Sequence, residues 1–223
     1  MGIVVRRASL LEGARTATGI AVVIDVFRAF TTAAFCVAAG AREIVLVKDP
    51  QEALAMKARD PSLFLTGEVG GRPIPGFDAG NSPSEIEKLD LAGRRVVQRS
   101  SSGTQGVVAA GLATHVFLGS LVTASATCRA VANGSSVTLV AMGDGGEIPC
   151  PEDELCAAYL ELLLARRRID PAPMLAQLRW ERDWPEWFPR RDAELACEID
   201  RFDFALPVVH ENGLLIARPV RPG

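Results

Sequence analysis

The chain has 223 residues, of which 48% are hydrophobic and 23% charged, and a net charge of −3. These values are typical of a globular protein with a sizeable core and exclude a largely disordered chain. The small negative charge offers no basic surface for phosphate backbones, so we expect no nucleic-acid partner. No stretch approaches 18 uninterrupted apolar residues, and the first residues carry charges inside their apolar run. We therefore expect a cytoplasmic protein with no membrane partner.

The chain offers few residues for zinc or thiol chemistry. It holds five cysteines and two histidines, and the cysteines lack the paired short spacing of a zinc site. Neither histidine stands in a recognisable catalytic string. A Ser-His, Cys-His or histidine-rich metal mechanism is therefore disfavoured, and hydrolytic chemistry would depend on carboxylates, a divalent cation and positioned anion donors.

Residues 20–26, IAVVIDV, predict a strand buried on both faces, and the alanine-rich residues 27–40 predict a helix after it. In open α/β sheets, ligands bind where a strand passes into the N-terminus of a helix. We therefore take Asp25, Arg28 and Thr32 at this junction as candidate site residues.

The loop at residues 67–82, GEVGGRPIPGFDAGNS, is the least regular stretch of the chain. Its five glycines and two prolines favour one irregular backbone path. Groups that suit a metal or an oxyanion are set into this path at Glu68, Asp78, Asn81 and Ser82. The alternative is a connection across the end of a sheet, in which the polar residues make Asx turns.

Three more predicted strands end in polar turns that lead to helices. The strand at 94–98 passes through RSSSGTQG at 99–106, the strand at 115–119 passes through Ser120, and the strand at 136–142 passes through GDGGEIPCPEDE. The Ser/Gly turn suits a phosphate or sulfonate, or it is an ordinary turn capped by serines. The repeated units predict a three-layer α/β/α fold around a mostly parallel sheet, with the polar turns converging on one edge.

The C-terminal segment is less regular, with Trp180, Trp184 and Trp187 among prolines. We expect these tryptophans to pack against a neighbouring element or a second subunit, and we expect a homodimer. Two apolar strands joined by the turn ENG end the sequence and predict a hairpin at an antiparallel edge of the sheet. We expect one domain over residues 1–223, on which residues 168–223 pack as a peripheral extension.

Carboxylates in these turns predict a site for Mg²⁺. Because Mg²⁺ takes oxygen ligands and keeps several waters, two or three carboxylates are enough to hold it. The candidates are Asp25, Glu68, Asp78, Glu147, Glu152 and Asp153. Glu152 and Asp153 also stand in the first turn of a predicted helix, where the helix dipole favours negative charge, so their roles stay open.

Five strings resemble, in the same order and at similar spacing, the motifs of the 2-phosphosulfolactate phosphatases. They are IDVFRAFTTA, GEVGGRPIPGFDAGNSPSEI, RSSSGTQG, FLGSLVTASAT and GDGGEIPCPEDELCAAYL, and they cover roughly residues 20–165. The resemblance implies an α/β fold and Mg²⁺-dependent hydrolysis of 2-phospho-3-sulfolactate to 3-sulfolactate and phosphate, a step toward coenzyme M. It also implies that the binding partner is a small anionic phosphoester.

The resemblance further implies roles for individual residues. Catalysis falls to Asp25, Arg28, Glu68 and Asp78, with Glu68, Asp78 and Asp25 as the metal ligands. Substrate binding falls to Thr32, Asn81, Ser82, Ser101, Ser102, Gly103, Thr104, Gly119, Ser120 and Glu147. Glu152 and Asp153 lie in the fifth string.

The chain departs from the family pattern at two positions. Ser102 and Thr123 stand where the family commonly has asparagine, and a serine has the shorter reach. The substrate is therefore less well defined than the reaction, and a phosphatase of the same fold with another phosphorylated hydroxy acid as substrate is an alternative. A non-catalytic anion-binding relative is another. Whether water or Asp25 attacks the phosphorus is also left open.

Overall fold

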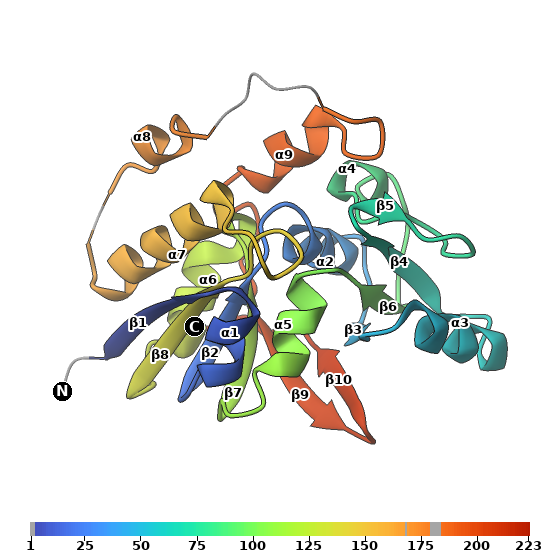
Figure 1. Cartoon of the computed structure of the whole chain (residues 1–223), viewed down its shortest axis with the longest axis horizontal. Helices are drawn as coiled ribbons and strands as arrows, with labels where there is room; N and C mark the ends of the chain where they lie inside the picture. The colour runs from blue at the N-terminus through green and yellow to red at the C-terminus, as the bar shows by residue number, and fades with distance from the viewer. Residues whose placement is uncertain (1–2, 168, 179–183) are drawn as a thin grey trace.

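The computed structural model of the chain describes residues 3–167, 169–178 and 184–223. One sheet with the strand order β1-β8-β2-β7-β9-β10-β3-β6-β4-β5 forms its centre, and helices cover both faces of this sheet (Figure 1). The strands are β1 (Val4–Ser9), β2 (Ile20–Ile24), β3 (Glu43–Leu46), β4 (Phe64–Val69), β5 (Arg72–Pro73), β6 (Arg95–Arg99), β7 (His115–Gly119), β8 (Ser136–Ala141), β9 (Leu206–Glu211) and β10 (Leu214–Ala217). The helices are α1 (Leu10–Thr16), α2 (Ala29–Ala38), α3 (Pro50–Arg59), α4 (Pro83–Ile86), α5 (Gly103–Ala109), the 3₁₀ turn η1 (Leu121–Thr123), α6 (Ala124–Val131), α7 (Pro151–Leu164), α8 (Ala172–Leu175) and α9 (Arg190–Ala196).

The apolar run of β2 shows why the sheet is covered on both sides. Val23 packs into the core formed with α1, α2 and α5, whereas Val22 and Ile24 pack into the core formed with α6 and α7. Successive side chains of a strand point to opposite faces, so a strand without polar alternation must be buried twice. The prediction of an α/β fold with a mostly parallel sheet is confirmed.

The C-terminal hairpin lies inside the sheet. Strands β9 and β10 pair with each other and are joined through Asn212 and Gly213, both at positive φ, as a two-residue hairpin turn requires. However, β9 also pairs with β7 and β10 with β3, each antiparallel. The predicted hairpin is confirmed, but its predicted place at an edge is wrong, because both of its strands lie between β7 and β3. Local turn chemistry defines a hairpin, whereas the strands that flank it depend on which sheet edges remain unpaired.

This insertion divides the parallel strands into two blocks, β1-β8-β2-β7 and β3-β6-β4. Because the hairpin makes antiparallel pairs on both sides, the two blocks run in opposite senses across it. In a flat sheet their carboxyl ends would lie at opposite edges. Instead, the backbone N–H of Gly103, after β6, donates to Asp25 Oδ2, after β2, at 2.8 Å. The carboxyl ends of β2 and β6 therefore meet in the folded chain, although their blocks run in opposite senses.

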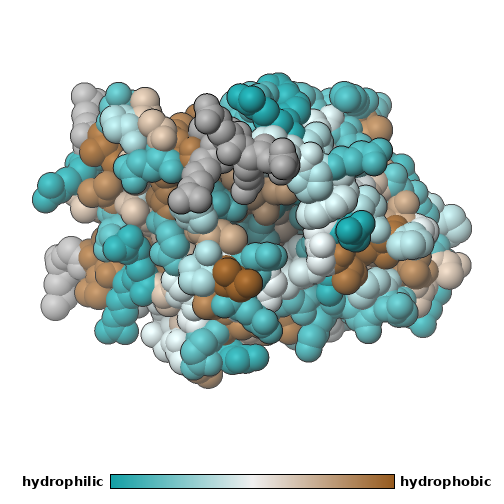
Figure 2. Space-filling model, turned by 45° about the horizontal axis from the view of Figure 1, so that its top comes forward, coloured by the Kyte–Doolittle hydropathy of each residue, from teal (hydrophilic) through white to brown (hydrophobic). Residues whose placement is uncertain are grey.

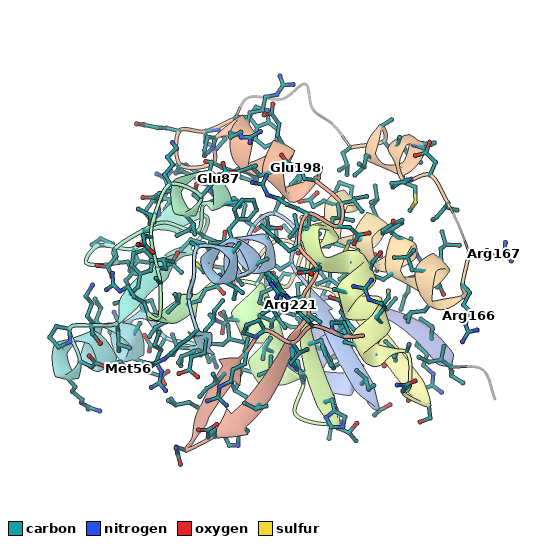
Figure 3. All side chains as sticks on the ribbon, turned by 180° about the vertical axis from the view of Figure 1, so that it is seen from behind. Met56, Glu87, Arg166, Arg167, Glu198 and Arg221 are labelled. Carbon is teal, nitrogen blue, oxygen red and sulfur yellow. The ribbon has the colours of Figure 1, made fainter. Side chains whose placement is uncertain are left out.

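Helix α9 is held against α4 by a cluster of charged side chains. Figure 3 labels Glu87 and Glu198, which lie close together where these helices meet. Arg201 pairs with Glu87 at 2.6 Å and also with Glu198, and Arg191 lies 3.9 Å from Glu87 and 3.8 Å from Glu198. Each partly exposed pair contributes little alone, at most about 1 kcal/mol, but the shared partners connect the two helices.

The tryptophan segment contacts the loop at residues 67–82. Ring atoms of Trp187 lie so near Gly71 that an added Cβ there would stand 2.4 Å away. The expectation of packing against a neighbouring element is thus confirmed for Trp187. The ring of Trp184 lies 5.2 Å from that of Phe188. Trp180 lies outside the described residues, and the homodimer stays a prediction.

The visible surface is mixed in character. On the face shown in Figure 2, hydrophobic residues are scattered among hydrophilic ones. Over the described ranges, every helix is too short or too polar to cross a membrane.

Candidate active site

The turns that follow β2, β4, β6 and β8 surround a cavity of about 240 Å³. The start of α7 and residues 187–188 complete its wall. Six residues predicted from the sequence line it, namely Asp25, Arg28, Glu68, Asn81, Ser101 and Ser102. Glu152 and Asp153, whose roles were open, line it as well. The polar turns do meet, although they come from two strand blocks of opposite sense.

Asp25 stands at the carboxyl end of β2 and is almost completely buried. Its Oδ1 accepts a hydrogen bond from the Ala29 N–H at 2.9 Å, and its Oδ2 accepts the bond from Gly103. Burial raises the pKa of Asp25 to about 6, helped by the nearby carboxylates of Glu68 and Glu152 and opposed by the two backbone N–H groups. The side chain is therefore fixed in orientation and titrates close to neutral pH.

Glu68, near the end of β4, is also buried and ties neighbouring turns together. It accepts hydrogen bonds from the backbone N–H and the hydroxyl of Ser101, the latter at 3.0 Å, and from the Gly71 N–H at 2.6 Å. Ser101 thus holds Glu68 as well as lining the cavity. A neighbouring hydroxyl, Ser102 Oγ, donates to the carbonyl of Gly143 at 2.5 Å and so joins the turn after β6 to the turn after β8.

Arg28, just before α2, is tightly bound by the protein itself. Its Nη1 donates to the carbonyl of Trp187 at 2.8 Å and to Asp192 Oδ2 at 3.0 Å, and its Nη2 donates to the carbonyl of Gly71 at 3.1 Å. The guanidinium also lies over the ring of Phe188, 4.3 Å from its centre. Sequence reasoning missed Asp192, because an acid in the first turn of a helix is a common feature that the dipole alone explains.

Asp153, in the first turn of α7, holds two turns of one strand block. Its Oδ1 accepts from the Val26 N–H at 2.7 Å and its Oδ2 from the Gly143 N–H at 2.8 Å. Burial, together with the charge of Asp25, raises the pKa of Asp153 well above its ordinary value. This carboxylate therefore connects the turn after β2 to the turn after β8, a role that its place at a helix terminus did not reveal.

Asp78 lies outside the cavity, contrary to its predicted place beside Glu68. The side chain is partly exposed, pairs with Lys57, and accepts from the Leu65 N–H at 2.7 Å. The loop folds back along β4, where Ala79 bridges to Thr66, so residue 78 returns to the middle of the strand whereas Glu68 stands near its end. The structure therefore does not support a metal site shared by Glu68 and Asp78.

Several predicted substrate-binding residues do not line the cavity but hold the elements around it in place. The hydroxyl of Ser82 donates to Asp192 at 2.8 Å, and Thr104 exchanges hydrogen bonds with Ser100. The Gly103 N–H binds Asp25, and the Gly119 carbonyl accepts from the Asp25 N–H at 3.2 Å. The remaining three also lie outside the cavity lining, namely the buried Thr32 and Ser120 and the exposed Glu147. A strand-end position does not show which side chains face the cavity.

The donor set suits a magnesium ion bound with substrate. No ready cluster of three His, Cys, Asp or Glu side chains that could hold a metal occurs within the part of the chain that the structure describes. Mg²⁺, however, commonly binds through one or two carboxylates and completes its shell with water and substrate phosphate. Asp25, Glu68 and Glu152 line the same cavity and offer oxygen ligands of this kind.

Comparisons with known proteins point to one family. A family model described as 2-phosphosulpholactate phosphatase matches residues 6–183. A protein of Deinococcus radiodurans named "Probable 2-phosphosulfolactate phosphatase" is 41% identical over 150 residues, which make up 66% of this chain and 62% of the relative. A Bacillus subtilis protein of the same name is 35% identical over 144 residues, 63% of this chain and 61% of the relative.

A third relative matches over a longer range. The protein of this name from Thermoplasma volcanium is 30% identical over 187 residues, 83% of this chain and 87% of the relative. The matched part spans about three-fifths of the length of the Deinococcus and Bacillus relatives. The family match includes the turns after β2, β4, β6 and β8 that form the cavity. The chain therefore belongs to the 2-phosphosulfolactate phosphatase family.

Proposed function

We propose that this protein hydrolyses a small, multiply anionic phosphomonoester, with 2-phospho-3-sulfolactate as the first candidate and 3-sulfolactate and phosphate as the products. The observation that carries the proposal is the meeting of Asp25, Glu68 and Arg28 on one cavity of about 240 Å³. A cavity of this size suits a small ligand. Family membership supports the choice of substrate, because the relatives carry that substrate in their names.

Within this proposal, the side chains of the cavity have separate tasks. Arg28 offers a rigid fork of N–H donors to phosphate, sulfonate or carboxylate oxygens. Asp25, fixed by two backbone N–H groups, either attacks the phosphorus itself or takes the proton of an attacking water. In the first case the P–O bond to the alcohol breaks as the bond to Asp25 forms, and water then cleaves the aspartyl phosphate. In both cases a proton must reach the leaving alkoxide.

The proposed cofactor is Mg²⁺. Asp25, Glu68 and Glu152 would hold it, and the bound ion would neutralise charge on the phosphoryl oxygens. The raised pKa of Asp25, caused by burial and by neighbouring carboxylates, supports a need for positive charge at this wall.

Phosphate release from a panel of phosphorylated hydroxy acids tests the function. We expect turnover of 2-phospho-3-sulfolactate with Mg²⁺ and its loss after chelation with EDTA. Turnover of another member of the panel, but not of the sulfonate, would identify a different substrate. Background release across the panel, with and without Mg²⁺, would favour an anion-binding relative without catalysis.

Rapid-quench single-turnover experiments separate the two routes of attack. An acid-labile phosphoenzyme that forms and decays at the rate of turnover, and that is absent in Asp25→Asn, would establish attack by Asp25. Solvent oxygen appearing in phosphate at the full rate, with no covalent intermediate, would establish attack by water.

A further inference from the structure

The position of the Arg28 guanidinium at the cavity wall depends on helix α9, which is far away in the sequence. We propose that Asp192 of α9 is a positioning residue, whose carboxylate holds the guanidinium of Arg28 at the cavity wall and so makes the C-terminal segment part of the active site. This inference rests on the proposed function, since it assigns Arg28 to the substrate anion. It concerns a residue that contacts Arg28 and does not line the cavity itself.

The two side chains form a pair that is removed from solvent. The side chain of Asp192 is 0% exposed and that of Arg28 is 3% exposed, and Arg28 Nη1 lies 3.0 Å from Asp192 Oδ2. A buried guanidinium without a counter-charge is strongly unfavourable, so its location follows that of its carboxylate. Among the ion pairs between described residues, Asp192 is the only acid that meets Arg28.

The second oxygen of Asp192 is occupied by helix α4. Its Oδ1 accepts from Ser82 Oγ at 2.8 Å, from Ser84 N–H at 3.0 Å and from Ser84 Oγ at 2.6 Å. The carboxylate is therefore fixed between α4 and Arg28, with hydrogen bonds to both oxygens. Such saturation is what a group needs if it is to define the position of a second group to within a fraction of an ångström.

The other contacts of Arg28 set its plane and come from neutral groups. The carbonyls of Trp187 and Gly71 accept from its two terminal nitrogens, and the ring of Phe188 lies against its face. Its three hydrogen bonds to described residues use two of its nitrogens. A guanidinium carries five N–H groups on three nitrogens, so donors remain for a substrate oxygen. Asp192 supplies the charge that the carbonyls lack.

Arg28 lies where its position affects ligand binding. Together with Asn81, Gly71 and Trp187, it lines both the cavity described above and a neighbouring cavity of about 300 Å³. A shift of the guanidinium would thus alter the wall that the two cavities share. Because a displacement of about 1 Å can cost roughly 100-fold in rate, the loss of Asp192 should be visible in kcat.

The first test compares Asp192→Asn with Glu87→Gln. Asp192→Asn keeps the shape of the side chain and removes its charge, and we expect kcat/KM to fall roughly 100-fold. Glu87→Gln weakens the ion pairs that join α9 to α4 without touching Arg28, and we expect a change of less than about threefold, as for a surface pair. Equal losses in the two variants would overturn the proposal and indicate a merely structural role.

Chemical rescue tests the position of the cation separately from the stability of the variant. Arg28→Ala should lose roughly 100-fold in kcat, and added guanidinium chloride at millimolar concentration should restore part of it. In Arg28→Ala combined with Asp192→Asn, the same guanidinium should restore nothing, because its binding carboxylate is gone. Equal rescue in both backgrounds would show that Asp192 does not hold the cation.

Folding and the proposed function are checked independently. If Asp192→Asn does not fold by circular dichroism, Ser84→Ala replaces it, since it removes one hydroxyl donor to Asp192 and should lower kcat/KM several-fold while the variant stays folded. A wild-type chain without turnover refutes the proposed function, whereas an active wild type with a fully active, folded Asp192→Asn refutes only the role of Asp192.

Discussion

On one side of the cavity, Asp25, Glu68 and Asp153 take part in none of the ion pairs between described residues, whereas on the other side Arg28 is paired with Asp192 at 3.0 Å. We call the first group, together with Glu152, the acidic wall. Backbone N–H groups hold the carboxylates of Asp25, Glu68 and Asp153, and burial raises the pKa values of Asp25 and Asp153. One side is thus arranged to receive a proton or a cation, and the other to keep a cation in place.

The largest effect is expected from breaking the acidic wall at Asp25. Asp25→Asn should lower kcat by roughly 10²–10⁴-fold, because it removes either the nucleophile or the base. Steady-state assays measure this loss, and Asp203→Asn, in an exposed ion pair with Arg221, is the matched control. A loss of less than tenfold in Asp25→Asn would assign the chemistry to another group.

Glu68→Gln tests whether the acidic wall binds the metal. We expect the Mg²⁺ concentration for half-maximal activity to rise by roughly 10–100-fold, since a carboxylate oxygen is replaced by a weaker donor. Titration of activity with Mg²⁺ measures the shift. An unchanged requirement, with kcat alone reduced, would mean that Glu68 only orients Ser101 and Gly71.

The pH dependence of activity tests the charge state of the acidic wall. If the Asp25 carboxylate is the active form, activity should fall as pH drops below the pKa of this group, which is about 6 without metal and is lowered by bound Mg²⁺. Because the charge of Glu152 helps to raise that pKa, Glu152→Gln should move the acid limb to lower pH. The pH profile of kcat/KM measures both. A limb that stays in place would exclude Glu152 as a cause.

The raised pKa of Asp25 also makes the free energy of unfolding depend on pH. Between the ordinary pKa of about 4 and the folded value of about 6, the folded chain keeps a proton on Asp25 that the unfolded chain has released. Asp25 therefore lowers the free energy of unfolding as pH rises through this range, in the absence of metal. Added Mg²⁺ at pH 7 should raise Tm if it binds the acidic wall.

The smallest effect is expected at Asp78. Asp78→Asn should leave the Mg²⁺ requirement unchanged and lower the free energy of unfolding by about 1 kcal/mol, through the weakened contacts with Lys57 and the Leu65 N–H. Urea unfolding measures the stability change. A raised Mg²⁺ requirement would return Asp78 to the metal site and would contradict its place outside the cavity.

Residues Asp25, Glu68 and Ser101 could be predicted as site residues because each lies at or just after the end of a recognisable strand. Position at a strand end is a local property that periodicity reveals. For Thr32, Gly119 and other residues of the same turns, the same reasoning failed to separate residues that line the cavity from residues that frame it. That distinction depends on the direction of each side chain, which neighbouring elements decide.

By itself, the sequence determined the repeated units of strand, polar turn and helix, the C-terminal hairpin, and the family. These follow from local periodicity, turn chemistry and ordered motifs. Only the tertiary structure placed the hairpin between β7 and β3, set the two strand blocks in opposite senses, and joined Arg28 to Asp192. These features depend on pairing and burial between segments far apart in the chain, for which no local pattern carries a signal.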